Sequence, residues 1–380
     1  MSEHTERAAP APLAWGRNLQ LFLATVASVF FTYVYVRAES RGGGLLEREG
    51  LVEGAMFAGS LLTILVAHEL GHYVAARIHR VEASLPYFIP LPIVSPFGTM
   101  GAVIRMRGTI PTRRALLDIG AAGPLAGMVF AIPLYLWGVA HSAVVPVDGD
   151  AVQLGESLLL KLLDRLAAPP LQPGSDIMLS PVAFGAWGGM FVTMINLLPV
   201  GQLDGGHVAY ALFGPKQDRY AKVVHRAMLA FFFVAIAGHL ARDVASGVSV
   251  RFLGRHLANA TVWLVWFQLL AILGLLAARG RGEEPKPGTL TVGVRVVATF
   301  GLVTVASLAR AQPGWVAPLA FFGGLAVLLA MEVKGGALRP NDLLDHPPTG
   351  AAPLDPTRKA VAIVTLLLFV LLFMPEPISM

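Results

Sequence analysis

Long apolar stretches recur along this chain of 380 residues and constrain its fold more than any other feature. Crossing the hydrocarbon layer of a bilayer takes about 20 mostly apolar residues in helical form. Roughly nine stretches meet that requirement. They are 19–36, 55–77, 117–140, 180–199, 223–242, 260–278, 290–309, 315–333 and 359–375. The sequence therefore predicts an all-α polytopic membrane protein with eight or nine transmembrane helices.

The composition supports this fold class and excludes several others. Apolar residue types make up 55% of the chain and charged types only 14%, whereas soluble globular domains carry about 25% charged residues. A water-soluble fold of this length would have too little charged surface to cover itself. The absence of cysteine excludes disulfides, thiolate nucleophiles and Cys-ligated metals.

Basic residues are distributed unevenly over the connections between the apolar stretches. If the N-terminus is cytoplasmic, the cytoplasmic segments hold 18 Lys and Arg residues and the opposite side holds 9. This bias favours that orientation, because cytoplasmic loops of membrane proteins are enriched in Lys and Arg. We expect an integral membrane protein of a bacterial or archaeal cytoplasmic membrane. No nucleic-acid partner is expected, since the net charge of +5 arises from arginines that flank apolar stretches.

The second apolar stretch contains the sequence His68-Glu69-Leu-Gly-His72. On a helix, two histidines four positions apart project from one face and can reach one Zn²⁺ ion at about 2.0–2.1 Å. Glu69 lies between them and can act as a general base. Ionisable side chains inside an apolar segment are costly unless they are paired or functional. The alternative is a polar helix face that lines a water cavity without metal.

A catalytic zinc site typically has three protein ligands, so one more ligand is expected. Asp204 follows the fourth apolar stretch, 132 residues after His72. Pro199 ends the preceding helix, and Gly205 and Gly206 permit tight turns around the carboxylate. The predicted topology places the ends of the second and fourth stretches on the same side of the membrane. These features together make Asp204 the candidate third ligand.

The two motifs together resemble the site-2 protease family of intramembrane zinc metalloproteases. The resemblance rests on HELGH (68–72) and on the Asn-x-x-Pro-x-Gly-x-x-Asp-Gly-Gly pattern (196–206), and extends to IGAAGPLAG (119–127). HPPT…PLDPTRK (346–359) resembles members of the branch without a PDZ domain. We therefore expect three regions: 1–50 with the first span, 51–215 as the catalytic membrane core, and 216–380 as C-terminal transmembrane helices.

The resemblance implies proteolysis of transmembrane protein substrates inside the lipid bilayer. It makes His68, His72 and Asp204 the ligands of one Zn²⁺ ion per chain, with Glu69 as the base and the active site toward the cytoplasmic side. It also implies that Asn196 lies near the catalytic centre and donates a hydrogen bond to the substrate carbonyl or oxyanion. His207 and Gln202 stay open as assisting residues. For His207 we favour a structural role, because a fourth ligand would close the coordination shell.

The connection between the second and third stretches is the expected substrate contact. Its prolines exclude one continuous helix, while GTMGAVIRMRG (98–108) alternates like a strand. The resemblance implies a small membrane-associated β-hairpin whose edge pairs with an unwound substrate, which exposes the scissile carbonyl. The alternative is a re-entrant loop used only for packing. The expected contacts are Phe97, Gly98, Thr99, Met100, Gly101, Ala102, Val103 and Ile104.

Glycines gather in two further patches of the third and fourth stretches. Gly123-x-x-x-Gly127 and Gly185-x-x-Gly188-Gly189 are typical of close helix packing in membranes. We expect this packing to bring Asp204 within reach of the two histidines. Neither patch is expected to take part in the chemistry.

Two other functions remain open from the sequence alone. A metal-binding transporter would need acids or histidines along a path through the bilayer, and stretches six to nine have almost none. A catalytically silent membrane scaffold would be free to lose the motif residues that this chain retains. Both alternatives are less favoured than the metalloprotease.

Overall fold

The computed structural model describes residues 15–41, 43–93, 95–107, 110–146, 153–247, 253–280, 282–285, 287–311, 314–335 and 344–379. The helices are α1 (Trp15–Arg41), α2 (Arg48–Ile78), α3 (Arg113–Ala140), α4 (Leu158–Ala167), α5 (Pro181–Asn196), α6 (Asp204–Phe213), α7 (Gln217–Ala245), α8 (Leu253–Gly280), α9 (Val292–Ala311), α10 (Val316–Gly335) and α11 (Pro356–Leu372), with a 3₁₀ turn at Gly214–Lys216. The strands are β1 (Glu82–Ala83), β2 (Tyr87–Pro90), β3 (Thr99–Val103), β4 (Met106–Arg107), β5 (Ala143–Pro146), β6 (Gln153–Leu154), β7 (Ser175–Met178) and β8 (Ile378–Ser379). The fold class predicted from the sequence is confirmed.

Within these ranges, seven helical segments are long and apolar enough to cross a membrane. They are α1, α2, α3, the continuous run from α6 to α7, α8, α9 and α10. The two other predicted spans form helices that are too short for this criterion. α5 has 16 residues and α11 has 17, because α5 ends before Pro199 and α11 ends at Leu372, before Pro375.

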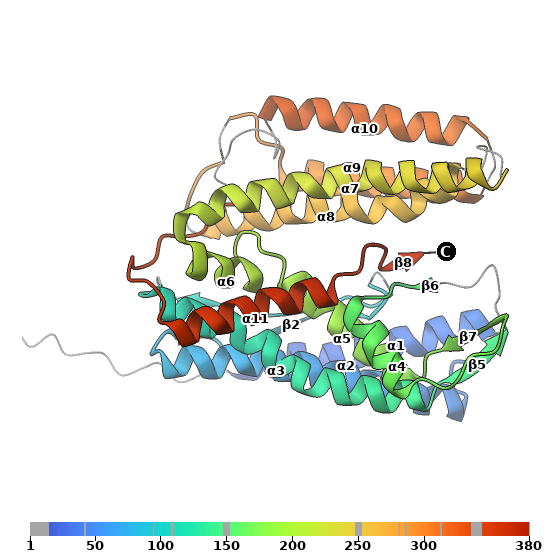
Figure 1. Cartoon of the computed structure of the whole chain (residues 1–380), viewed down its shortest axis with the longest axis horizontal. Coiled ribbons are helices and arrows are strands. Elements are labelled where there is room, and N and C mark those ends of the chain that lie inside the picture. The colour runs from blue at the N-terminus through green and yellow to red at the C-terminus, as the bar shows by residue number, and fades with distance from the viewer. Residues whose placement is uncertain are drawn as a thin grey trace, which may run out of the picture.

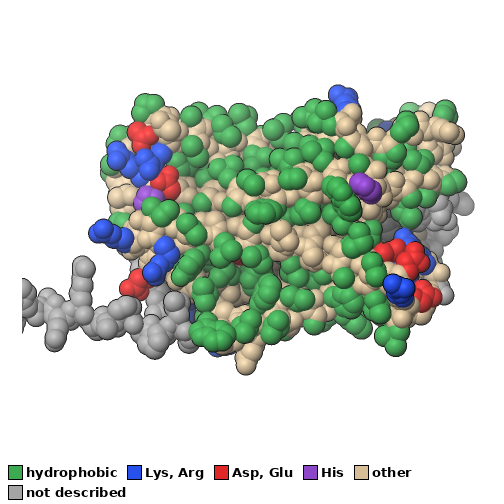
Figure 2. Space-filling model, turned by 90° about the horizontal axis from the view of Figure 1, so that it is seen from below, with side chains coloured by type: hydrophobic (Ala, Val, Ile, Leu, Met, Phe, Trp, Pro, Cys, Tyr) green, Lys and Arg blue, Asp and Glu red, His purple; other side chains and the backbone are tan. Residues whose placement is uncertain are grey.

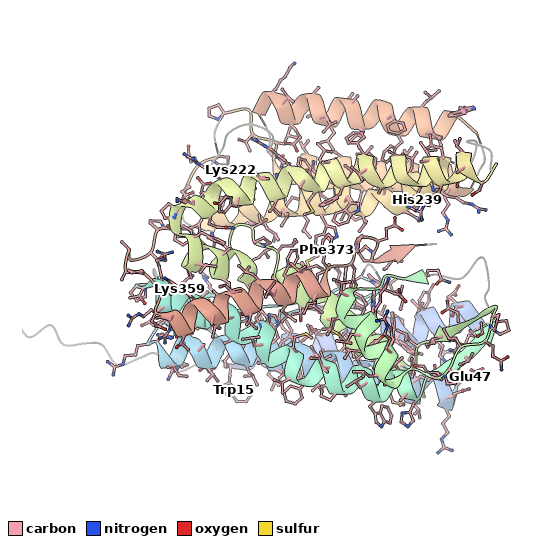
Figure 3. The ribbon with its side chains drawn as sticks, viewed as in Figure 1. Trp15, Glu47, Lys222, His239, Lys359 and Phe373 are labelled. Carbon is pink, nitrogen blue, oxygen red and sulfur yellow. The ribbon has the colours of Figure 1, made fainter. Side chains whose placement is uncertain are left out.

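The long helices lie roughly side by side along the longest dimension of the molecule (Figure 1). α7 to α10 gather on one side, while α1 to α5 form the other side together with α11, which packs on α3, α4 and α6. Charged side chains collect mainly at the two ends of the face seen in Figure 2, and an apolar belt separates them. Lys222 and Lys359 lie at one end and Glu47 at the other (Figure 3). This distribution suits a protein that crosses a bilayer along its long axis.

The glycines of α5 allow close contact with α2, as the sequence predicted. A Cβ atom at Gly189 would lie 2.8 Å from the Ile64 side chain of α2. At Gly185 it would lie 2.8 Å from the carbonyl oxygen of Phe57. Both distances are below van der Waals contact, so only glycine permits this helix separation. The contact fixes α5, and therefore the loop that follows it, against the motif helix α2.

The predicted β-hairpin is formed by β2 and β3 in antiparallel pairing. Tyr87 pairs with Val103 and Phe88 with Ala102, and a bulge follows before Pro90 pairs with Thr99. The hairpin packs on α1, where the Phe22 and Phe88 rings meet edge to face at 5.0 Å. A second antiparallel pair, β5 with β7, was not predicted from the sequence.

A fully buried polar cluster lies inside the bundle of α7 to α10. The Arg295 guanidinium donates to both carboxylate oxygens of Glu332 and, at 2.7 Å, to the side-chain oxygen of Gln268. All three side chains are at most 1% exposed. Glu332 is the exception to the expectation that stretches six to nine carry almost no acids. The cluster therefore joins α8, α9 and α10 through paired and enclosed charges.

Candidate metal centre

Three side chains that are distant in sequence meet between α2 and α6. The Nε2 atoms of His68 and His72 lie 3.1 and 3.2 Å from the same carboxylate oxygen, Oδ2 of Asp204. The candidate ligand atoms all lie within 4.8 Å of one another. Among the described residues, His68, His72 and Asp204 form a group whose spacing could hold a metal ion. The structure therefore brings together the three ligands predicted from the sequence.

Asp204 is placed by a tight loop between α5 and α6. The chain leaves α5 at Asn196, turns at Gly201 with a φ angle of +55°, and enters α6 at Asp204. The sequence analysis assigned tight turns to Gly205 and Gly206, and that reason is wrong because both residues are helical. Their missing side chains matter for packing: a Cβ atom at either position would overlap a backbone carbonyl of the preceding loop.

His72 is oriented by a backbone carbonyl of α3. Its Nδ1 atom lies 2.7 Å from the carbonyl oxygen of Ile119. A carbonyl only accepts hydrogen bonds, so Nδ1 carries the proton and the neutral ring presents an Nε2 lone pair toward Asp204. Histidine ligands of metals commonly donate their second ring N–H in this way. A lone pair and a carboxylate oxygen at 3.2 Å repel unless a proton or a cation lies between them.

The donor set and its spacing fit a zinc ion. Tetrahedral zinc with bonds of about 2.0–2.1 Å has ligand atoms about 3.3 Å apart, close to the 3.1 and 3.2 Å observed around Asp204 Oδ2. Two imidazoles and one carboxylate are ligands that zinc accepts, and three protein ligands leave one position open. The centre is protected, since the side chains of His68 and Asp204 are 3% and 16% exposed.

Glu69 and Asn196 border this cluster. The Glu69 side chain is buried, with 5% exposed, and it follows His68 directly in α2. Asn196 is the last residue of α5, and its side-chain nitrogen lies 3.4 Å from Nε2 of His68. The cluster thus has a carboxylate and an amide at its edge, in addition to the three candidate ligands.

The residues that the sequence left open have different surroundings. His207 is buried, and its Nδ1 atom lies 2.7 Å from Nε2 of His346. Gln202 is exposed. His79, which caps the C-terminal end of α2, donates its Nε2–H to Asp118 Oδ2 at 2.8 Å. These contacts depend on residues far apart in sequence, and no local spacing signalled them.

The expected substrate-contact residues separate into two groups. Phe97, Gly98, Thr99 and Gly101 are buried. Phe97 contacts the rings of Phe184, Trp187 and Phe191 on α5. Met100 and Val103 on β3 are 61% and 53% exposed, while Ala102 and Ile104 are half-buried. The exposed residues of β3 are therefore the ones accessible to a partner.

Comparison with known families bears directly on this cluster. A profile of peptidase family M50 matches residues 56–235, which include all three candidate ligands. Through this segment, which is just under half of the chain, the protein resembles peptidase family M50. The M50 segment begins in α2 and ends in α7, and it contains the hairpin, the loop before α6 and both sequence motifs.

Curated relatives match about two fifths of the chain. The probable zinc metalloprotease EGY2, chloroplastic, of Arabidopsis thaliana is 36% identical over 166 residues, which cover 42% of this chain and 29% of the relative. The EGY2 protein of Oryza sativa subsp. indica is 35% identical over the same shares. The probable zinc metalloprotease EGY1 of Arabidopsis thaliana is 35% identical over 41% of this chain and 29% of its own length. The match spans under a third of these relatives. No solved structure matches the chain significantly.

Proposed function

We propose that this chain is a zinc-dependent intramembrane metalloprotease that cleaves peptide bonds of transmembrane protein substrates. One observation carries the proposal: the Nε2 atoms of His68 and His72 both lie close to one carboxylate oxygen of Asp204. These residues lie on helices that are long enough to cross a membrane. The M50 segment supports the proposal, and so do relatives that are named probable zinc metalloproteases.

Each residue of the cluster has a role in the proposed reaction. His68, His72 and Asp204 hold the zinc ion. A bound zinc ion supplies Lewis acidity, which makes water a stronger acid and a carbonyl a better electrophile. Glu69 accepts a proton from the attacking water and delivers it to the departing amine. Asn196 donates a hydrogen bond from its side-chain nitrogen to the substrate carbonyl or oxyanion.

The exposed side of β3 is the proposed substrate contact. A helical substrate hides its scissile carbonyl within its own hydrogen bonds, so it must unwind before cleavage. Pairing of the unwound segment with β3 would satisfy the freed backbone groups in a water-poor environment. Met100 and Val103 present exposed side chains there.

The proposed location is a membrane, with the catalytic cluster toward the cytoplasmic side. The cluster lies near the C-terminal ends of α2 and α5, at the end that the distribution of Lys and Arg assigns to the cytoplasm. A bacterial or archaeal membrane stays a prediction. The chloroplastic location in the names of the relatives belongs to those plant proteins.

The decisive experiment compares metal content and cleavage in purified variants. We expect one zinc per wild-type chain and cleavage of a transmembrane reporter substrate. Glu69→Gln should keep the zinc and abolish cleavage, whereas Asp204→Ala should lose both. His141→Ala, which removes an exposed histidine at the C-terminal end of α3, is the matched control and should keep both.

Three outcomes would contradict the proposal. Cleavage by Glu69→Gln at the wild-type rate would remove Glu69 from the mechanism. Full zinc content in Asp204→Ala would remove Asp204 from the site. Zinc uptake into proteoliposomes without any cleavage would favour the transporter over the protease.

A further inference from the structure

Residues 344–358 lie outside the M50 segment but pack on its catalytic elements. We call this segment the C-terminal strap; it comprises the loop before α11 and the first turn of that helix. Leu354 lies in an apolar cluster with Leu116 and Leu117 of α3 and Val208 of α6. The strap therefore reaches both the helix of Asp204 and the helix that orients His72.

The first contact of the strap is made by His346 with α6. Nδ1 of His346 lies 2.7 Å from the carbonyl oxygen of Pro347, so this nitrogen carries the proton and Nε2 is an acceptor. His207 therefore donates its Nδ1–H to His346 Nε2 at 2.7 Å. The His346 ring also stacks on Tyr210 at 4.2 Å. Since His207 follows Asp204 by one helical turn, these contacts fix the helix end that presents the carboxylate.

Two residues of α7 hold His346 and its neighbour Asp345 in place. The backbone N–H of His346 donates to Asp218 Oδ1 at 3.0 Å. The neighbouring Asp345 pairs with Lys222 at 2.7 Å. Both partners belong to α7, so the beginning of the strap is held from two sides. Such anchoring lowers the entropy cost of holding the His346 ring in one position.

The second contact of the strap is made by Arg358 with α3. Its Nη2 and Nε atoms donate to the two carboxylate oxygens of Asp118 at 2.8 and 3.1 Å. A two-point contact between guanidinium and carboxylate fixes orientation as well as distance. Asp118 also accepts from His79, which follows α2. The next residue, Ile119, supplies the carbonyl that receives the His72 proton.

We propose that His346 and Arg358 are positioning residues of the metal centre, acting from opposite ends of the strap. His346 acts through His207 on the helix of Asp204, and Arg358 acts through Asp118 on the carbonyl that orients His72. This inference rests on the proposed function, because it assigns the strap to the same zinc site. Residues that orient metal ligands in this way typically change metal affinity about 10- to 100-fold when they are replaced.

The test measures the zinc dissociation constant of the full chain by competition with a chromogenic chelator. Arg358→Gln should weaken zinc binding about 10- to 100-fold. Arg358→Lys keeps the charge and should give a smaller loss. Lys359→Gln removes a positive charge from the next residue, which is exposed at the same end of the molecule (Figure 3), and should bind zinc as the wild type does.

A double variant separates positioning from a general loss of packing. If Arg358 acts through Asp118, Arg358→Gln combined with Asp118→Asn should bind zinc no more weakly than the worse single variant. At the other end, His346→Phe keeps an aromatic ring over Tyr210 but removes the nitrogen acceptor. It should also weaken zinc binding, and the visible spectrum of the cobalt-substituted protein should differ from that of the wild type.

The outcomes distinguish the strap from the function on which it rests. Wild-type zinc affinity in Arg358→Gln, Arg358→Lys and His346→Phe would overturn the role of the strap while leaving the protease intact. Strictly additive losses in the double variant would overturn the route through Asp118. A wild-type chain that binds no zinc would instead overturn the proposed function. Thermal unfolding of each metal-free variant shows whether a loss of affinity reflects unfolding.

Discussion

Gly123 of α3 lies directly against the imidazole of His72, and a Cβ atom at this position would overlap the ring. One helical turn further along α3, a Cβ atom at Gly127 would lie 3.4 Å from the Cβ of His68. The two glycines therefore make room for the two histidines where α2 and α3 are closest. The spacing of the glycines matches that of the histidines because both pairs lie one turn apart on helices in contact.

Gly123→Ala should therefore weaken zinc binding. The added methyl group must displace the His72 ring or push α3 away, and either movement disturbs the hydrogen bond from His72 to the Ile119 carbonyl. We expect zinc affinity to fall at least about tenfold, corresponding to about 1.4 kcal/mol. Chelator competition measures the effect. Gly59→Ala on α2 is the control, since a Cβ atom there meets nothing within 4 Å; equal affinities of the two variants would contradict the prediction.

The sequence predicted the ligands of the site but few of the residues around them. His68 and His72 were found because their spacing is local, and Asp204 because it is a single acid beside helix-breaking residues. The role of Gly123 was predicted only as packing, since its partner is set by the angle between two helices. The contacts of Asp118 with Arg358 and of His207 with His346 join segments more than 100 residues apart, and no periodicity encodes them.

In the fold, too, features marked by local sequence were predicted and pairings between distant segments were missed. The β2–β3 hairpin was predicted because prolines and alternation mark it within one connection. The pairing of β5 with β7 was missed because the two strands are short and separated by α4. Long helices were predicted from hydropathy, but the short α5 was counted as a full span because apolar loop residues at 197–200 continue its pattern.

Removing the acid of the buried cluster in the C-terminal bundle should destabilise the protein strongly. Glu332→Ala leaves the Arg295 guanidinium buried without its carboxylate partner. Breaking one side of a buried ion pair typically costs about 3–5 kcal/mol. Thermal or denaturant unfolding in detergent should show this loss. Replacing both partners in Arg295→Met/Glu332→Leu should restore much of the stability, because no uncompensated charge remains.

The control for this experiment is Glu284→Ala, which removes an exposed acid near the start of α9. Substitutions at such surface positions usually change stability by less than about 0.5 kcal/mol. If Glu332→Ala unfolds no more easily than Glu284→Ala, the cluster contributes nothing measurable to the bundle. Zinc content should stay at one per folded chain in both variants, since neither touches the metal centre.

Charges introduced on the exposed side of β3 should impair substrate binding but not metal binding. Met100→Asp and Val103→Asp each place a carboxylate where the proposed mechanism pairs an unwound substrate with the strand. Desolvating that charge should raise KM about tenfold, corresponding to about 1.4 kcal/mol. Val144→Asp, on the exposed face of β5, is the matched control. Unchanged KM in both β3 variants would remove β3 from substrate recognition.

Asp355 should make the stability of the strap depend on pH. The backbone N–H of Arg358 and then its guanidinium hold the pKa of the Asp355 carboxyl below its ordinary value of 3.8. A depressed pKa in the folded state means that the ionised group stabilises the fold above pH 3.8 and that this contribution is lost as the pH falls through the folded-state pKa.

Asp355→Asn keeps an acceptor for the Arg358 N–H but removes the charge. The variant should melt at a lower temperature than the wild type near neutral pH, and the difference should shrink below pH 3.8. Melting curves recorded across this range test the assignment, and a difference that stays constant with pH would show that the ionisation of Asp355 is not what holds the start of α11.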